Sequence, residues 1–96
     1  MIAIIVKLRI RAGLEDEFER IFAERRGKVL ANERDALQYD LYRSPGEQGS
    51  FLIIERFPSA DAYRAHLAGS RDFERMMACF AQPPQVSMFD SVQGAS

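Results

Sequence analysis

The chain has 96 residues, of which 47% are hydrophobic and 28% charged, and its 13 basic and 14 acidic residues leave a net charge of −1. This balance is typical of one globular domain and gives no indication of binding to nucleic acid or to an anionic membrane. The single cysteine cannot form an internal disulfide, no stretch approaches the ~20 apolar residues of a membrane span, and no secretory signal is recognisable, so we expect a cytoplasmic protein.

The first segment, residues 1–11, alternates between apolar and mixed positions, which predicts a β-strand with one fully apolar face. The apolar face carries Ile2, Ile4, Val6, Leu8 and Ile10. Gly13 ends this strand. Residues 14–32 then place apolar side chains at helical spacing and acidic ones in the first turn, where the helix dipole favours negative charge. The apolar positions of this helix are Leu14, Phe18, Ile21, Phe22, Val29 and Leu30.

A β-hairpin is predicted next, because residues 37–43 and 50–57 alternate and the intervening SPGEQG is dense in turn-forming residues. In the second of these strands Glu55 and Arg56 fall on opposite faces. Pro58 stops the strand and Ser59 can cap a helix that runs to about Ala68. Ser70 can cap a second short helix that carries Phe73, Met76, Met77 and Phe80. Residues 85–92 read as a last strand, and 93–96 as a frayed tail.

The order β-α-β-β-α-β predicts an α+β fold of the ferredoxin-like, split βαβ type, with a four-stranded antiparallel sheet in a single domain, residues 1–96. Both helical segments then cover one face of the sheet. The other face carries Ile5 and several aromatic residues, which are unfavourable in water. A chain this short buries a thin core, so we expect a homodimer that packs sheet face against sheet face.

Several motifs resemble the antibiotic biosynthesis monooxygenase (ABM) family, which includes quinol monooxygenase-like proteins. They are LQYDLYRSP at 37–45, FLIIERF at 51–57, and DAYRAHL at 61–67 followed by Asp-Phe at 72–73. The spacing of Ala62, His66 and Phe73 is the most specific part, and the resemblance covers residue 1 to about residue 92. It implies a dimeric α+β barrel that oxygenates small, electron-rich aromatic molecules with O2 and needs no metal, flavin or haem.

Two departures from the family pattern stand out. Many relatives have a second histidine shortly before the phenylalanine of the last helix, where this chain has Ser70-Arg71-Asp72, which argues against a two-histidine mechanism. Relatives often have Glu-Pro-Gly where this chain has Glu33-Arg34-Asp35, a difference that we expect to affect only a turn. The haem-degrading branch uses a tryptophan and another histidine, and this chain has no tryptophan and one histidine.

His66 is the leading catalytic candidate, because an imidazole can exchange a proton near neutral pH and a phenol reacts with O2 as its phenolate. Glu55 is predicted to orient His66. Tyr63, three residues before His66, shares its helix face. The candidate substrate-binding residues are Tyr63, Tyr39, Tyr42, Phe73 and Met77. One histidine with scattered carboxylates does not make a metal site, so we expect none.

Simpler interpretations stay open at each position. His66 can pack beneath its helix and bond a carbonyl or Glu55, and the tyrosines can serve core or dimer packing. Cys79 is expected to be a small buried hydrophobe. For function, the alternatives are a non-catalytic dimer that binds a small ligand or has a regulatory role, and a haem-binding relative with His66 as axial ligand.

Overall fold

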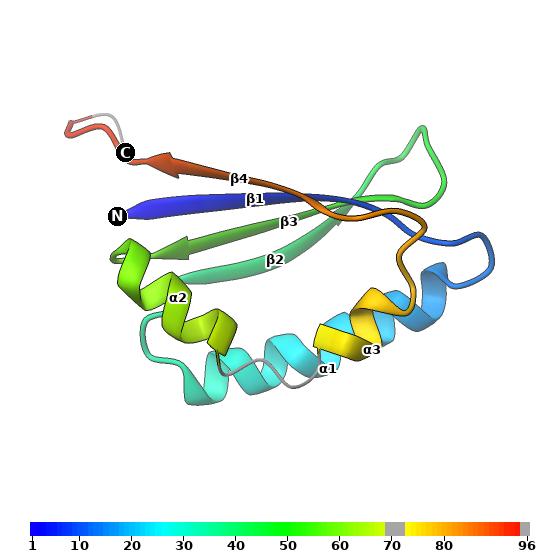
Figure 1. Ribbon diagram of the computed structural model, residues 1–96, viewed down its shortest axis with the longest axis horizontal. Helices are drawn as coiled ribbons and strands as arrows, with labels where there is room; N and C mark the ends of the chain where they lie inside the picture. Colours follow the sequence, from blue (N-terminus) through cyan, green and yellow to red (C-terminus); the bar gives the residue numbers. More distant parts are fainter. Residues whose placement is uncertain (69–72, 95–96) are drawn as a thin grey trace.

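The computed structural model describes residues 1–68 and 73–94, which form a four-stranded sheet with three helices (Figure 1). The elements in chain order are β1 (Ile2–Arg9), α1 (Glu15–Asn32), β2 (Gln38–Arg43), β3 (Ser50–Phe57), α2 (Ala60–Ala68), α3 (Phe73–Met77) and β4 (Gln85–Asp90). The predicted α+β class and the order of strands and helices are therefore confirmed.

The sheet has the strand order β2-β3-β1-β4 and is antiparallel throughout. β1 and β3 pair along their whole length, from Ile2 opposite Phe57 to Arg9 opposite Ser50. All three helices lie on one side of the sheet, with α1 running beneath the strands and α2 and α3 beside it (Figure 1). This is the ferredoxin-like arrangement that the sequence predicts.

The core lies between the helices and one face of the sheet, as the alternation in the strands predicts. Phe18 of α1, Met76 of α3 and Phe57 and Ile4 of the sheet are the largest fully buried side chains. Phe18 also contacts the rings of Phe51 and Phe80 edge to face, with centroids 5.2 and 6.2 Å apart. Aromatic pairs at this spacing add to the burial of apolar area.

The opposite face of the sheet, which we call the open face, is covered by no described helix. Tyr42 and Phe89 are 49% and 55% exposed there, and Ile5, Leu52 and Ile54 are half-buried. The sheet therefore has the second face, of mixed apolar and polar side chains, that the sequence predicts. Dimerisation across it stays a prediction.

A glycine is required where the β2–β3 hairpin returns towards β1. Gly49 has a φ of +83°, and a Cβ atom at this position would lie 2.9 Å from the carbonyl oxygen of Ile10. The close approach lets the amide of Ile10 donate to the carbonyl of Gly49 at 2.8 Å. Only glycine adopts this conformation without strain and also leaves room for the neighbouring backbone.

Some expected boundaries and faces differ from the structure. The last strand ends at Asp90 rather than Val92. Leu30, predicted on the apolar face of α1, is 44% exposed because it follows the buried Val29 by one residue, about 100° around the helix. The predicted cap Ser70 lies outside the described residues, as does the end of the tail at 95–96. Within the described residues, no helix is both long and apolar enough to cross a membrane.

Candidate functional site

His66 lies on the buried side of α2, where the local sequence places it. The helix starts directly after Pro58, and the predicted cap is formed because the amide of Ala62 donates to Oγ of Ser59 at 3.2 Å. Tyr63 and His66 are the two buried residues of α2 and are one turn apart. Only 5% of His66 is exposed, and its ring faces the sheet.

Both ring nitrogens of His66 have a close polar neighbour. Nδ1 lies 2.6 Å from Oε1 of Glu33, and Nη2 of Arg25 lies 3.3 Å from Nε2. A guanidinium has only donors, so the contact with Arg25 makes Nε2 the acceptor and leaves the ring proton on Nδ1, where it is donated to Glu33. Oε1 of Glu55 lies 3.4 Å from Nε2 on the same side as Arg25.

Glu55 projects into the core from β3 because it is in phase with Phe51, Ile53 and Phe57. Its cross-strand neighbours are Ile4 and Tyr39, and Oε1 is buried without a hydrogen-bond partner among the described residues. Burial raises the pKa of Glu55 from 4.5 to about 7, although the positive charge of Arg25 opposes the shift. The carboxyl group can therefore exchange a proton near neutral pH.

Arg25 is a site residue that sequence reasoning missed. It is 5% exposed on α1, and its Nε donates to the hydroxyl of Tyr39 at 2.7 Å. The signal was present in the sequence, because Arg25 occupies the helical position between the buried Phe22 and Val29 where an apolar residue is expected. A buried guanidinium is rare and needs partners, here the hydroxyl and imidazole groups of the site.

Glu33 is the second residue that was missed. From the sequence, Glu33 was considered only as part of the turn before β2, where it matches the family pattern, whereas its carboxylate contacts His66 from the end of α1. Its amide also donates to the carbonyl of Val29 at 2.8 Å and closes the helix. The nearest carboxylate to Nδ1 is thus supplied by Glu33, while Glu55, the predicted orienting residue, lies beside Nε2.

Aromatic rings surround the imidazole and make its environment apolar. The ring centroids of Phe57, Tyr39 and Tyr63 lie 5.1, 5.4 and 6.4 Å from that of His66. Burial lowers the pKa of His66 below 6.5, although the hydrogen bond and charge of Glu33 act in the opposite direction. Burial also raises the pKa of Tyr39 to about 12 and raises that of Tyr63. At neutral pH the imidazole of His66 is therefore neutral and the two tyrosines keep their protons.

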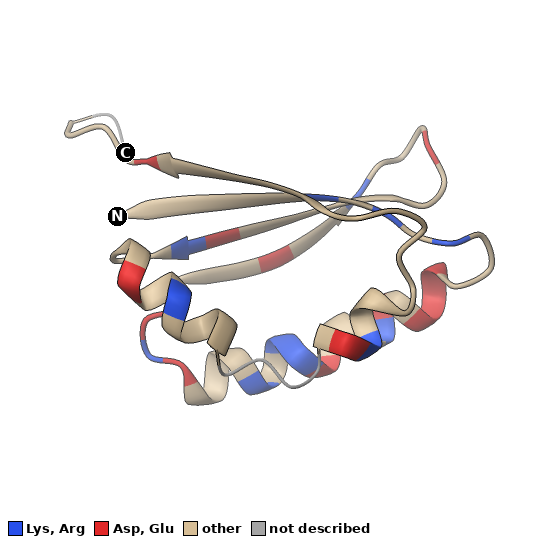
Figure 2. Cartoon of the chain, viewed as in Figure 1, with Lys and Arg blue, Asp and Glu red and all other residues tan. Residues whose placement is uncertain are grey.

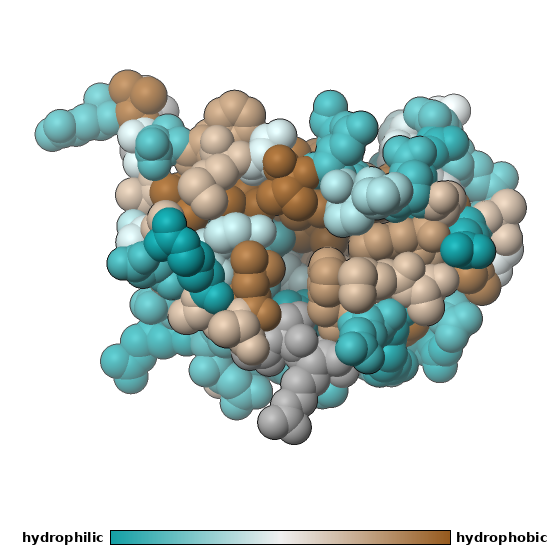
Figure 3. All heavy atoms as spheres, viewed as in Figure 1, coloured by the Kyte–Doolittle hydropathy of each residue, from teal (hydrophilic) through white to brown (hydrophobic). Residues whose placement is uncertain are grey.

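These groups form one wall of a cavity between the sheet and the helices, which we call the inner cavity. Its volume is about 210 Å³. Hydrophobic atoms are exposed in Figure 3 along the gap between β4 and the helices α2 and α3. The lining combines the polar cluster with aromatic and aliphatic side chains: Val6, Leu8, Arg25, Tyr39, Ile53, Glu55, Tyr63, His66, Leu67, Phe73, Met76, Phe80, Pro84 and Val86.

A second depression, the outer hollow, lies on the other side of His66 and has a volume of about 660 Å³. It is formed where the end of α1 and the approach to β2 meet α2, and Lys28, Glu33, Arg34 and Asp35 give it a polar lining. Figure 2 shows the positions of the charged residues along α1 and in the turn that follows it. Arg25 and His66 line both spaces and therefore separate the inner cavity from the outer hollow.

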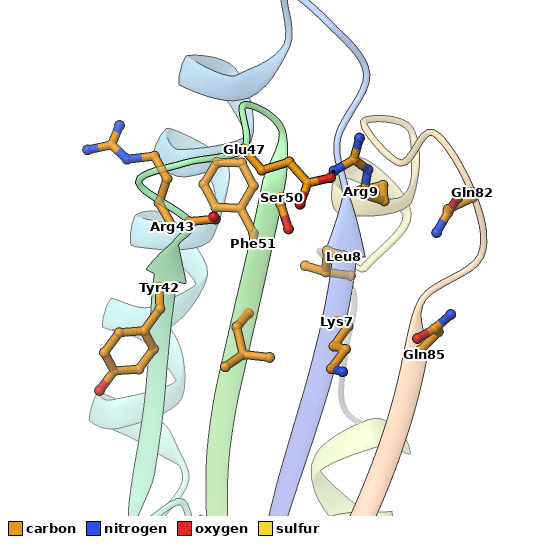
Figure 4. A pocket seen from close by; sticks show the side chains of 12 residues that line it. Lys7, Leu8, Arg9, Tyr42, Arg43, Glu47, Ser50, Phe51, Gln82 and Gln85 are labelled. Carbon is orange, nitrogen blue, oxygen red and sulfur yellow. Dashed lines mark hydrogen bonds and ion pairs between the residues drawn. The ribbon is translucent and has the colours of Figure 1, made fainter.

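The structure brings together five of the seven predicted site residues, namely His66, Glu55, Tyr39, Tyr63 and Phe73. Tyr42 lies on the open face because it is three residues from Tyr39 along a strand, and side chains at odd spacing point to opposite faces. It lines a separate depression of about 490 Å³ beside the hairpin, where Glu47 reaches Arg9 (Figure 4). Met77 is 44% exposed and does not line the inner cavity, because Met76 takes the buried position on α3.

No group of three or more His, Cys, Asp or Glu side chains within residues 1–68 and 73–94 is arranged to hold a metal ion. Cys79 is 3% exposed, and burial raises the pKa of its thiol. The prediction that Cys79 is a small buried residue is confirmed.

Comparison with known proteins gives consistent matches at the level of family and fold. The sequence model of the family described as antibiotic biosynthesis monooxygenase matches residues 1–78. A crystal structure of a protein assigned to this family from Caulobacter crescentus is 31% identical, with a TM-score of 0.86 over 96% of this chain and 90% of the other. One from Bordetella bronchiseptica is 25% identical, with a TM-score of 0.79 over 95% of this chain and 96% of the other.

A more distant match shows the fold alone. SnoaB from Streptomyces nogalater, described as a cofactor-independent oxygenase, is 20% identical, with a TM-score of 0.80 over 96% of this chain and 93% of the other. A comparison with curated proteins found no match. The family model covers most of the chain, and the Caulobacter protein aligns over nearly all of it. This chain therefore belongs to the antibiotic biosynthesis monooxygenase family.

Proposed function

We propose that this protein is a cofactor-independent monooxygenase that oxidises a small phenol or quinol with O2. The observation that carries the proposal is the unpartnered Oε1 of Glu55, buried beside Nε2 of His66 at the wall of an apolar cavity. Two groups that can take up a proton thus face a space lined mainly by apolar side chains. Buried acid–base pairs of this kind are common at catalytic sites.

In the proposed reaction, the substrate hydroxyl replaces Arg25 as the donor to Nε2 of His66, and Nε2 accepts its proton. The resulting phenolate gives one electron to O2, and the superoxide and the substrate radical combine to form a carbon–oxygen bond. Transfer of a proton from Nε2 of His66 to the peroxide yields a hydroperoxide at a ring carbon that still carries hydrogen. Loss of water from this carbon leaves a carbonyl, so that one oxygen atom of O2 enters the product and the other leaves as water. The positive charge of Arg25, which lines the same cavity, favours the phenolate.

The dimensions and lining of the cavity support a small aromatic substrate. An apolar cavity of about 150 Å³ in another protein holds benzene, so a volume of about 210 Å³ admits one ring with substituents. Tyr63, Phe73 and Phe80 supply aromatic surface, and Tyr39 and Arg25 supply hydrogen-bonding groups. Such a combination of an apolar wall with a few placed polar groups is typical of small-molecule sites.

The decisive experiment is O2 uptake by metal-free protein with a panel of hydroquinones and polyphenols, corrected for autoxidation without protein. We expect uptake by the wild type to fall at least tenfold in His66→Ala, a loss of ~1.4 kcal/mol of transition-state stabilisation. Glu55→Gln should give a comparable loss. The matched control is Glu47→Gln, which changes an exposed carboxylate at the hairpin and should leave uptake unchanged.

Uptake that is equal in wild type and His66→Ala would contradict the base role. Uptake at the background rate for every compound would instead favour the alternative of a ligand-binding protein, which a screen for saturable binding in the inner cavity would test. Haemin gives a separate control, because an axial role for His66 predicts a Soret band that disappears in His66→Ala.

The cytoplasmic location and the homodimer remain predictions from the sequence.

A further inference from the structure

We propose that Glu33 is a positioning residue that fixes the ring proton of His66 on Nδ1 and conducts the proton taken from the substrate to solvent through the outer hollow. This inference deepens the proposed function and rests on it. His66 accepts a proton on the side of the inner cavity, and Glu33 removes one on the opposite side. The path is therefore substrate hydroxyl, Nε2, Nδ1, carboxylate of Glu33 and water.

The placement of the residues around the two spaces supports this direction of transfer. Glu55 and Tyr39 line the inner cavity and not the outer hollow, whereas Glu33 lines the outer hollow and not the inner cavity. His66 lines both, with Nε2 3.4 Å from Glu55 and Nδ1 2.6 Å from Glu33. The imidazole therefore lies between the two spaces, with Nε2 beside the inner cavity and Nδ1 beside the outer hollow.

Exposure changes along the path in the order that a proton outlet requires. The side chains of His66 and Glu55 are 3% and 6% exposed, and that of Glu33 is 33% exposed. Water can therefore reach the carboxylate of Glu33 while the imidazole stays enclosed. Such an outlet lets His66 pass its proton on while the substrate anion reacts with O2, so that the imidazolium does not persist beside the cavity.

The proton balance of the step is simple. The O–H bond of the substrate breaks as an N–H bond forms at Nε2, and the N–H bond at Nδ1 breaks as an O–H bond forms on Glu33, which then releases the proton to water. When Nε2–H later protonates the peroxide, the transfers run in reverse and water returns a proton to Nδ1 through Glu33, so the starting tautomer is restored. The charged and titratable groups around His66 are Arg25 of α1, Glu33 after it, Tyr39 of β2, Glu55 of β3 and Tyr63 of α2. Of these, Glu33 alone contacts Nδ1 within the described residues.

The first test needs no substrate. The chain has one histidine, so the ¹⁵N signals of a labelled imidazole belong to His66 and report its tautomer and its pKa. We expect the neutral wild type to carry its proton on Nδ1. Because Glu33 raises the pKa of His66, this pKa should fall in Glu33→Ala and in Glu33→Gln. The amide of Glu33→Gln can still accept from Nδ1 and should preserve the tautomer, whereas Glu33→Ala should not.

The second test measures turnover. O2 uptake should fall at least tenfold in Glu33→Ala, and formate should restore part of it by entering the outer hollow as a substitute carboxylate. Formate should not restore His66→Ala, which has lost the group that passes the proton on. The matched control is Asp35→Asn, a change of an exposed carboxylate in the same hollow that should alter neither the pKa of His66 nor uptake. Circular dichroism verifies that each variant is folded.

The two proposals fail in different ways. A neutral His66 with its proton on Nε2, or a tautomer and pKa unchanged in Glu33→Ala, would overturn the role of Glu33 whatever the reaction is. If the wild type consumes no O2 with any compound, the proposed function fails and the NMR result alone decides whether Glu33 positions the proton. Uptake in Glu33→Ala equal to wild type would overturn the outlet even if the tautomer is as expected.

Discussion

The guanidinium of Arg25 lies 3.3 Å from Nε2 of His66, although 41 residues separate them in the chain. The same guanidinium donates to Tyr39, so one side chain of α1 joins the imidazole of α2 to the phenol of β2. Arg25 thereby brings a positive charge to the atom that we expect to act as the base. This charge opposes protonation of His66 and also lowers the pKa of Glu55.

Replacing Arg25 should therefore raise both pKa values. In Arg25→Gln we expect the pKa of His66 and that of Glu55 to increase, because the cation that disfavours the imidazolium and favours the carboxylate is gone. NMR titration of the imidazole and of the ¹³C carboxyl signal measures both. Arg26→Gln is the control, since the neighbouring Arg26 is directed to Asp40 and to the carbonyl of Tyr39. A decrease in the pKa of His66 in Arg25→Gln would contradict the assignment.

Ionisation of Glu55 should make the free energy of unfolding fall as the pH rises. Its pKa is about 7 in the folded protein and 4.5 as the model value for the unfolded chain. A carboxyl group with a raised folded pKa stabilises the protein fully below the unfolded pKa, and this contribution is lost as the pH rises through the folded pKa.

We therefore expect Glu55→Gln, which cannot ionise, to gain about 3 kcal/mol relative to wild type between pH 4.5 and pH 7. Urea denaturation of both proteins at several pH values measures this difference. The titration of His66 occurs in both proteins and therefore largely cancels. Glu47→Gln should follow the wild type over the same range, because the side chain of Glu47 is 62% exposed. A difference that does not change with pH would show that Glu55 is not buried as described.

The hydroxyl of Tyr39 should matter for stability, whereas that of Tyr42 should not. Tyr39→Phe removes the acceptor for Nε of the buried Arg25, and an unsatisfied buried donor costs about 1–3 kcal/mol. Tyr42→Phe removes an exposed hydroxyl from the open face, and we expect a change within about 0.5 kcal/mol. Chemical denaturation of the two variants gives a direct comparison, and equal losses would contradict the assignment of Tyr39 to the buried cluster.

The hairpin offers a test of backbone conformation. Gly49→Ala places a Cβ atom at a positive φ and 2.9 Å from the carbonyl oxygen of Ile10, so it should cost at least about 1–2 kcal/mol. Gly46→Ala in the same hairpin has nothing within 4 Å of its new atom and should be tolerated. Thermal denaturation of both variants measures the contrast. A Gly49→Ala protein as stable as the wild type would mean that the hairpin does not approach β1 as closely.

The open face leads to a prediction about assembly. We expect the wild type to be a dimer at micromolar concentration by light scattering, and Ile54→Asp to be a monomer because it places a charge in the centre of the apolar patch. Leu30→Asp changes an exposed leucine on α1 and should leave the dimer intact. A wild-type monomer would contradict this account of the open face, and its Ile5, Leu52 and Ile54 would then need another explanation.

The sequence by itself determined the order of strands and helices, the two faces of the sheet and the candidacy of His66, Tyr63 and Glu55. The order and the faces follow from local rules, because alternation in a strand and spacing in a helix are set by backbone geometry. The candidacy of the three residues depends also on the resemblance to the family. Only the tertiary structure decided that Arg25 and Glu33 contact His66, since both contacts join residues more than 30 positions apart in the chain. It also showed that His66 divides two spaces. Contacts of this kind depend on how α1 and α2 pack on the sheet, which a pattern along the chain does not specify.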